Sequence, residues 1–146
     1  EFLLRQPVAG DRSGLMATPS PTIESAAHPL AGKRMSGAEM IVQVLADEGV
    51  DTIFGYSGGA ILPTCDAVFR YNDDRRDDNG DVPMPLIVPA NEQGAGFMAA
   101  GYARASGKVG VVMVTSGPGA TNTVTPVRDC MADSIPIVVI LSLFHF

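Results

Sequence analysis

The sequence predicts an α/β domain with a parallel β-sheet flanked by helices on both faces. Short, almost wholly apolar runs alternate along the chain with segments whose apolar residues fall at helical spacing. Glycine-rich turns follow the apolar runs, as expected where strands lead into helices. With 146 residues, the chain is long enough for one domain with a proper core and too short for two.

Residues 1–35 are predicted to form a flexible, disordered N-terminal arm, and residues 36–146 the domain itself. Residues 16–35 of the arm are rich in Pro, Ala, Ser and Thr and have no apolar periodicity. The first methionine of the arm is Met16, and a natural start there would leave residues 1–15 as upstream or added sequence. Neither a signal peptide nor an Arg-rich transit peptide fits this segment.

The first two predicted helices flank a short strand. Ser36 with Glu39 three residues later forms a capping-box pattern, and the helix that follows ends at Gly49. Residues 51–56 are expected to form a strand that runs into a Ser-Gly-Gly turn, followed by a helix over about 60–70.

A polar loop rich in Asp and Arg follows the second helix. Asp77, Asn79 and Asp81 have the spacing that begins a calcium loop, but Val82 and Val88 stand where that loop needs Gly and Glu. We therefore expect a solvated surface loop and no metal site.

The second half of the domain continues the alternation of strands and helices. Buried strands are predicted over 86–88 and 109–115, and a last strand over 136–141. Helices are predicted over 92–106 and about 120–131, the latter with some irregularity at Pro126.

Three glycine-rich or polar turns, within residues 55–59, 89–92 and 116–119, each follow a strand. The carboxyl ends of parallel strands meet at one edge, so these turns should share the usual location of a binding site. The glycines could serve turn geometry alone, or they could let a ligand approach the main chain. None of the turns matches GxxxxGK[ST] or GxGxxG, so a nucleotide-phosphate loop has no motif support.

Glu92 is the candidate catalytic residue. A carboxylate in the first turn of a helix is favoured by the helix dipole, so Glu92 could be merely a helix-end charge next to the cap Asn91. The helix after it, however, is crowded with Gly and Ala, which would let another helix or a flat ring pack very close. A carboxyl group in such a place suits proton exchange with a weak base.

Long motifs of the chain resemble a known family. GVDTIFGYSGGAILPTCDA, NEQGAGFMAAGYARASGKVGVVMVTSGPGATN and DSIPIVVI, within Ser36 to Ile140, resemble the amino-terminal domain of acetolactate synthase (acetohydroxyacid synthase) large subunits. This is the pyrimidine-binding domain of thiamine-diphosphate enzymes. The resemblance implies a fragment of an enzyme that condenses pyruvate with a second 2-oxo acid in branched-chain amino acid biosynthesis.

The resemblance also implies the site. Glu92 matches the family glutamate that hydrogen-bonds N1′ of the aminopyrimidine ring and activates the cofactor. The implied cofactor-binding set is Tyr56, Ser57, Gly58, Gly59, Glu92, Thr115, Gly117, Pro118 and Asn122. Ser57 stands where the family usually has Pro, and Asn91 where it commonly has His.

The implied cofactor of this domain is thiamine diphosphate. Mg²⁺ and FAD are implied for the full-length enzyme, on domains that this sequence does not include, and LSLFHF replaces the family's Thr-Gly-Gln-Val-like turn. The chain alone is therefore predicted to be a truncated, inactive fragment. Sibling thiamine-diphosphate carboligases or decarboxylases, and a non-catalytic α/β binding module, remain as alternatives.

The expected partners and location follow from composition and resemblance. The net charge of −6 disfavours nucleic acid and anionic membranes as partners. The family implies 2-oxo acid substrates and a homodimer or homotetramer with the bare helix across the dimer interface, with a regulatory subunit left open as a further partner. Cys65 and Cys130 are expected as buried thiols in a reducing, cytoplasmic setting, with plastid or mitochondrion left open for a eukaryotic source.

Overall fold

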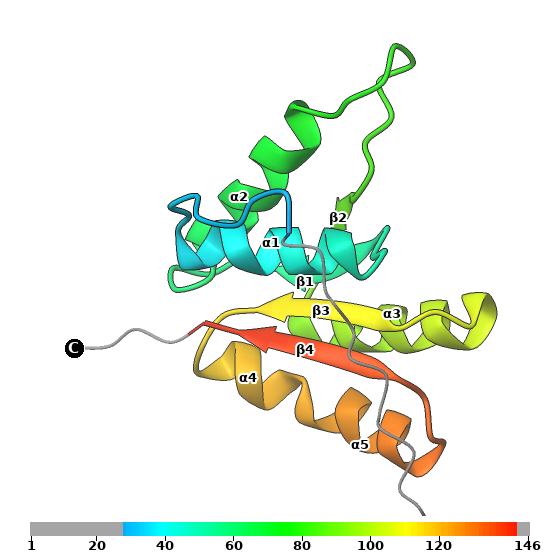
Figure 1. Cartoon of the computed structure of the whole chain (residues 1–146). Helices are drawn as coiled ribbons and strands as arrows, with labels where there is room; N and C mark the ends of the chain where they lie inside the picture. The colour runs from blue at the N-terminus through cyan, green and yellow to red at the C-terminus, as the bar shows by residue number, and fades with distance from the viewer. Residues whose placement is uncertain (1–27, 143–146) are drawn as a thin grey trace, which may run out of the picture. The chain divides into compact units, whose positions relative to one another are not determined.

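A computed structural model of the chain describes residues 28–142, and its centre is a four-stranded parallel sheet (Figure 1). The strands lie in the order β2-β1-β3-β4. Their bounds are Ile53–Tyr56 for β1, Leu86–Ile87 for β2, Gly110–Val114 for β3 and Ile137–Leu141 for β4. All three pairings are parallel, so the predicted fold class is confirmed.

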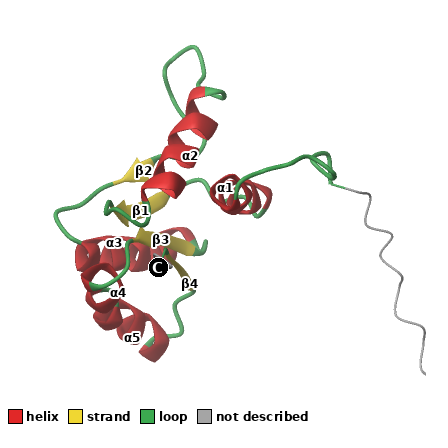
Figure 2. Ribbon diagram, turned by 90° about the vertical axis from the view of Figure 1, so that its left-hand side faces the viewer, coloured by secondary structure: helices red, strands yellow, loops and turns green. Residues whose placement is uncertain are grey.

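Helices cover both faces of the sheet, as the two views show (Figures 1 and 2). The helices α1 and α2 lie on one face, and α3, α4 and α5 lie on the other. Their bounds are Gly37–Asp47 for α1, Leu62–Asp73 for α2, Glu92–Ser106 for α3, Pro118–Asn122 for α4 and Val124–Ala132 for α5.

Alternation along β1 and β3 divides the core into two layers. Ile53 and its register partner Val111 pack with α1 and α2. The next pair, Phe54 and Val112, packs with Ala95 of α3 on the opposite face. This follows from the two-residue period of a strand, which sends successive side chains to opposite faces.

The start of α1 confirms the predicted capping box. The Ser36 N–H donates to Glu39 Oε2 at 2.7 Å, and the Glu39 N–H donates to Ser36 Oγ at 3.2 Å. These reciprocal bonds satisfy backbone donors that the first turn of a helix leaves unpaired.

The outer strands are shorter or more exposed than predicted. β2 contains only two residues, and its Ile87 side chain is 38% exposed rather than buried. β4 is likewise only half-buried. Each of these strands pairs on one side only, so each is an edge strand of the four that the described residues form.

The helix predicted over about 120–131 is wrong as a single element. It divides at Thr123 into α4 and α5. Pro126 has no N–H to donate to the carbonyl of Asn122, so the helical ladder cannot continue through this point. The Thr123 hydroxyl instead donates to the Ala120 carbonyl at 2.7 Å.

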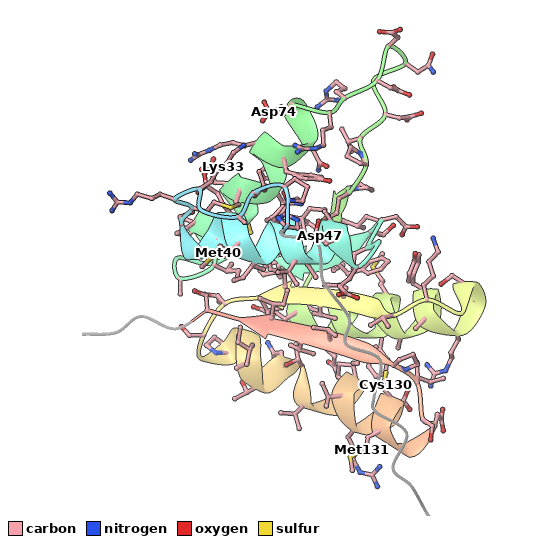
Figure 3. All side chains as sticks on the ribbon, in the orientation of Figure 1. Lys33, Met40, Asp47, Asp74, Cys130 and Met131 are labelled. Carbon is pink, nitrogen blue, oxygen red and sulfur yellow. The ribbon has the colours of Figure 1, made fainter. Side chains whose placement is uncertain are left out.

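Two neighbouring side chains of α5, Cys130 and Met131, point to opposite sides of the helix (Figure 3). Cys130 is 1% exposed, whereas its neighbour Met131 is 78% exposed and points away from the sheet. Cys65 is also buried, so the expectation of two buried free thiols is confirmed. Burial raises the pKa of both thiols and so favours their unreactive protonated form.

The Asp-rich loop between α2 and β2 is organised by its own side chains. Asp77 Oδ1 accepts hydrogen bonds from the N–H groups of Asn79 at 3.0 Å and Asp81 at 2.8 Å. Asp77 therefore supports a surface turn. Within residues 28–142, no three His, Cys, Asp or Glu side chains are grouped to hold a metal ion.

The chain divides into two compact units between Lys33 and Arg34. The predicted arm falls largely on residues 1–27, outside the described residues, so its flexibility stays a prediction. None of the helices between residues 28 and 142 has both the length and the apolar character needed to cross a bilayer.

Candidate functional site

The turns after β1 and β3 meet at the carboxyl edge of the sheet. A Cβ atom added to Gly58 would lie only 2.5 Å from Thr115 Cγ2, so the backbone of one turn rests on the side chain of the other. Gly119 packs against the same methyl group, where an added Cβ would lie at 3.0 Å. Two of the three turns predicted to share an edge are therefore in direct contact.

The turn after β2 joins this edge through a side-chain hydrogen bond. Glu92, the first residue of α3, is 8% exposed. Asn122, the last residue of α4, donates from Nδ2 to Glu92 Oε2 at 2.9 Å. Thirty positions separate these residues in sequence, and the parallel sheet brings them together.

The position of Glu92 depends on how α3 begins. Asn91 has an extended backbone, and its side chain accepts a hydrogen bond from the Gly94 N–H at 2.7 Å. That bond ends the loop and starts the helix at Glu92. The expected role of Asn91 as a cap is thus confirmed, with Asn in the place where the resembling family commonly has His.

The second carboxylate oxygen of Glu92 is accessible. Oε2 accepts the bond from Asn122, and no bond to Oε1 occurs within the described residues. Yet no fully buried side-chain nitrogen or oxygen atom in residues 28–142 lacks a hydrogen-bond partner. Oε1 must therefore reach the surface, although most of the residue is buried.

The Gly- and Ala-rich face of α3 packs closely within the chain. A Cβ added to Gly96 would lie 2.3 Å from Pro126 Cγ in α5. On the sheet side, a Cβ on Gly110 would lie 2.3 Å from the Ala99 carbonyl oxygen. Close packing within the chain therefore explains part of the Gly and Ala content of α3. The helix that packs against Gly96 is α5. Gly101 faces open space instead.

The remaining predicted site residues lie in the same turns with differing exposure. Tyr56 ends β1 and is half-buried, while Ser57 and Gly59 are exposed. Gly117 adopts φ +64°, a conformation that suits glycine, and the exposed Pro118 then starts α4. Among the predicted site residues, Gly58 packs against Thr115, and Asn122 is hydrogen-bonded to Glu92. No other predicted site residue has a side-chain hydrogen bond to Glu92 within the described residues.

Gly119 lies in a predicted turn but was not among the implied site residues, and the pairing of Glu92 with Asn122 was not predicted. Gly119 is buried against Thr115, and its only sequence signal is the second glycine of the Gly-Pro-Gly turn. The pairing has no local signal, because it depends on the helix break at Thr123.

A second polar cluster lies at the opposite edge of the sheet. Asp51, just before β1, accepts hydrogen bonds from the Lys108 ammonium and the Tyr102 hydroxyl. The bond from Lys108, followed by that from Tyr102, lowers the pKa of the Asp51 carboxyl. The same bonds raise the pKa of Tyr102 and of Lys108. This cluster fastens the end of α3 that is far from Glu92.

A cavity of about 350 Å³ also lies away from the candidate site, at the amino end of β2. Its Arg76 side chain donates to Asp73 and to the Gly80 carbonyl, both at 3.0 Å. Its Asn72 side chain is bonded to the backbone of Met84. The Arg76 and Asn72 side chains are thus both bonded within the chain.

A parallel α/β domain with glycine-lined turns and a buried carboxylate at its carboxyl edge belongs to the class of cofactor- and ligand-binding α/β domains. Comparison with known proteins makes this more specific. Residues 35–143 match the family described as "Thiamine pyrophosphate enzyme, N-terminal TPP binding domain", and the chain belongs to this family. The cofactor of the family is accordingly thiamine diphosphate, as predicted.

Relatives of the chain include acetolactate synthases. The chain is 52% identical over 105 residues to the mitochondrial acetolactate synthase catalytic subunit of Saccharomyces cerevisiae, covering 72% of this chain and 14% of that protein. It is 47% identical over 140 residues to the corresponding subunit of Aspergillus candidus, covering 87% and 19%. Identity to the isozyme 2 large subunit of Escherichia coli is 47% over 106 residues, covering 73% and 17%. The chain thus spans less than a fifth of the length of these relatives.

Proposed function

We propose that this chain is the pyrimidine-binding part of a thiamine-diphosphate-dependent acetolactate synthase and that Glu92 is its catalytic residue. The observation that carries the proposal is the state of Glu92, which is buried at the carboxyl edge with Oε1 still accessible. A carboxylate serving only as a helix-end charge gains nothing from being enclosed, since burial disfavours charge.

The residues at this edge fit a flat heterocyclic ring. Gly58 and Gly119 pack against Thr115, and Gly117 has open space where a side chain would stand. A ring can approach the turn at Gly117 without displacing a side chain. The Glu92 carboxylate supplies a group that can hold a proton opposite a ring nitrogen.

The residues of the candidate site would then divide the work with the cofactor. When bound, thiamine diphosphate supplies the electron sink for decarboxylating pyruvate and joining the product to a second 2-oxo acid. Glu92 would hold or move a proton at Oε1, and the Tyr56–Gly59 turn would line the side facing the substrate. Thr115, Gly117 and Pro118 would lie around the ring.

The wider assembly belongs to the same proposal. We place Mg²⁺ and FAD on domains outside this sequence. We place the exposed apolar side chains of α3, Phe97 and Met98, at a subunit interface of a homodimer or homotetramer. Branched-chain amino acid biosynthesis, a regulatory subunit, a cytoplasmic or organellar location and inactivity of the isolated chain are proposed from the family resemblance alone.

The test is a graft of residues 36–140 into a complete acetolactate synthase, with Glu or with Gln at position 92. Glu92→Gln keeps the size of the side chain and its hydrogen-bonding reach but removes its proton exchange. We expect acetolactate formation to fall by about 10²-fold or more. Equal rates in the two grafts would support the alternative of a non-catalytic α/β module. Product analysis with pyruvate and other 2-oxo acids would separate a synthase from a sibling carboligase or decarboxylase.

A further inference from the structure

We propose that Asn122 is a positioning residue that selects which carboxylate oxygen Glu92 presents. Its Nδ2 group donates to Oε2 at 2.9 Å, and this leaves Oε1 as the oxygen at the accessible edge. The inference rests on the proposed function, because the oxygen matters only if Glu92 exchanges a proton there. The resemblance implied instead that Asn122 contacts the cofactor.

Hydrogen bonds fix the backbone on both sides of Asn122, which is itself an exposed residue. The α4 turn begins at Gly117, whose carbonyl accepts the Thr121 N–H at 3.1 Å. It ends at Thr123, where both the N–H and the hydroxyl donate to the Ala120 carbonyl, at 3.2 Å and 2.7 Å. Asn122 lies between these bonds, at the last position before the chain turns into α5.

The pairing requires an amide at position 122. An ionised carboxylate only accepts hydrogen bonds, so the side chain that faces it must donate. Hydrogen bonds to a charged group are stronger than those between neutral groups. Aspartate has the shape of asparagine but lacks the donor, and at neutral pH it would place a second negative charge against Glu92.

A carboxylate with two free oxygens can rotate and offer either one to a ligand. Fixing Oε2 removes that freedom, and a proton-transfer group works best when its atom is held in place before the reaction. Glu92 is thereby held from both sides, through the backbone by the Asn91 cap and through the side chain by Asn122.

The experiment measures urea unfolding of the full chain for four forms: the original, Asn122→Asp, Glu92→Gln and the double variant. Asn122→Asp should lower the folding equilibrium constant about tenfold at pH 7. In the double variant the amide of Gln at position 92 can donate to the Asp at position 122. We therefore expect the tenfold loss to be largely recovered there. Asn79→Asp, which adds the same charge in an exposed loop, should change the folding constant by less than about twofold.

A second measurement follows the Asn122 side-chain amide directly by ¹⁵N NMR. Its resonances should shift in Glu92→Gln and stay unchanged in Asn79→Asp. If Asn122→Asp costs the same with Glu or Gln at position 92, and the amide resonances do not respond, the positioning role is overturned. That result is distinct from failure of the proposed function, which would appear as full activity of the Glu92→Gln graft.

Discussion

Gly96 of α3 lies directly against Pro126 of α5, so close that a Cβ at position 96 would come within 2.3 Å of Pro126 Cγ. This contact joins the helix that begins with Glu92 to the segment that follows Asn122. The spacing of the two helices therefore helps to set the distance between the carboxylate and the amide that holds it.

Gly96→Ala should destabilise the domain by about 1–3 kcal/mol, because the methyl group would overpack the contact with the rigid proline ring. The measurement is the free energy of unfolding from urea titration. Gly101→Ala is the matched control in the same helix, since nothing lies within 4 Å of a Cβ there. It should stabilise the domain by up to about 1 kcal/mol through helix propensity. Equal effects of the two substitutions would contradict the contact.

Gly58→Ala should disturb the candidate site, because its methyl group would meet Thr115 at 2.5 Å. Backbone shifts at this edge would move the turns that we assign to the ring, so the grafted synthase should lose affinity for thiamine diphosphate. Gly37→Ala, at the exposed start of α1, has open space and should leave that affinity unchanged. Retained affinity in Gly58→Ala would show that this turn lies away from the ring.

Asn72 should prove important for stability. It is buried, its amide donates to the Met84 carbonyl at 2.8 Å, and its oxygen accepts the Met84 N–H at 3.1 Å. Asn72→Ala would leave two backbone groups without these partners, at a cost of about 1–3 kcal/mol. Asn79→Ala, in the exposed loop nearby, should cost less than about 0.5 kcal/mol by the same chemical denaturation measurement. A neutral Asn72→Ala would mean that water replaces both bonds.

The Asp51 cluster should make stability depend on pH in a defined direction. The pKa of Asp51 is lowered by its bonds from Lys108 and Tyr102. The contribution of Asp51 to folding stability is therefore present above its pKa in the unfolded chain, about 3.9. That contribution is lost as the pH falls through the still lower folded value. Asp51→Asn should therefore be less stable than the original at neutral pH, and this difference should narrow below about pH 4.

The alkaline side supplies an independent check on the same cluster. The pKa values of Lys108 and Tyr102 are raised in the folded chain. Their contributions to folding stability are therefore present below their pKa values in the unfolded chain, about 10.4 and 10. These contributions are lost as the pH rises through the folded-state pKa values. Thermal unfolding of Asp51→Asn and the original across pH 3–11 would measure both effects. A difference that does not vary with pH would argue against a cluster held by charge.

Much of the fold could be predicted because its local signals agree with its tertiary structure. The Ser36–Glu39 capping box, the Asn91 cap and the apolar run of β3 each specify one element without help from distant residues. The helix break at Thr123 was less visible, because Pro126 can begin, kink or end a helix depending on its neighbours. The exposure of β2 and β4 depends on their place in the sheet, which periodicity alone does not give.

The sequence predicted which turns form the candidate site, but not how their side chains contact one another. Parallel strands place the turns at one edge whatever their side chains, so their shared location followed from topology. The bond from Asn122 to Glu92 and the contact of Gly58 with Thr115 depend on loop conformation and on the exact break between α4 and α5. No pattern within either segment encodes them.

The most direct measurement of the central claim is the rate of proton exchange at the thiazolium C2 of thiamine diphosphate bound to the grafted synthase. The graft with Glu92 should exchange this proton fast enough to support turnover, and Glu92→Gln should slow the exchange by about 10²- to 10⁴-fold with the cofactor still bound. An unchanged exchange rate in Glu92→Gln would contradict the assignment of Glu92 as the proton-transfer residue.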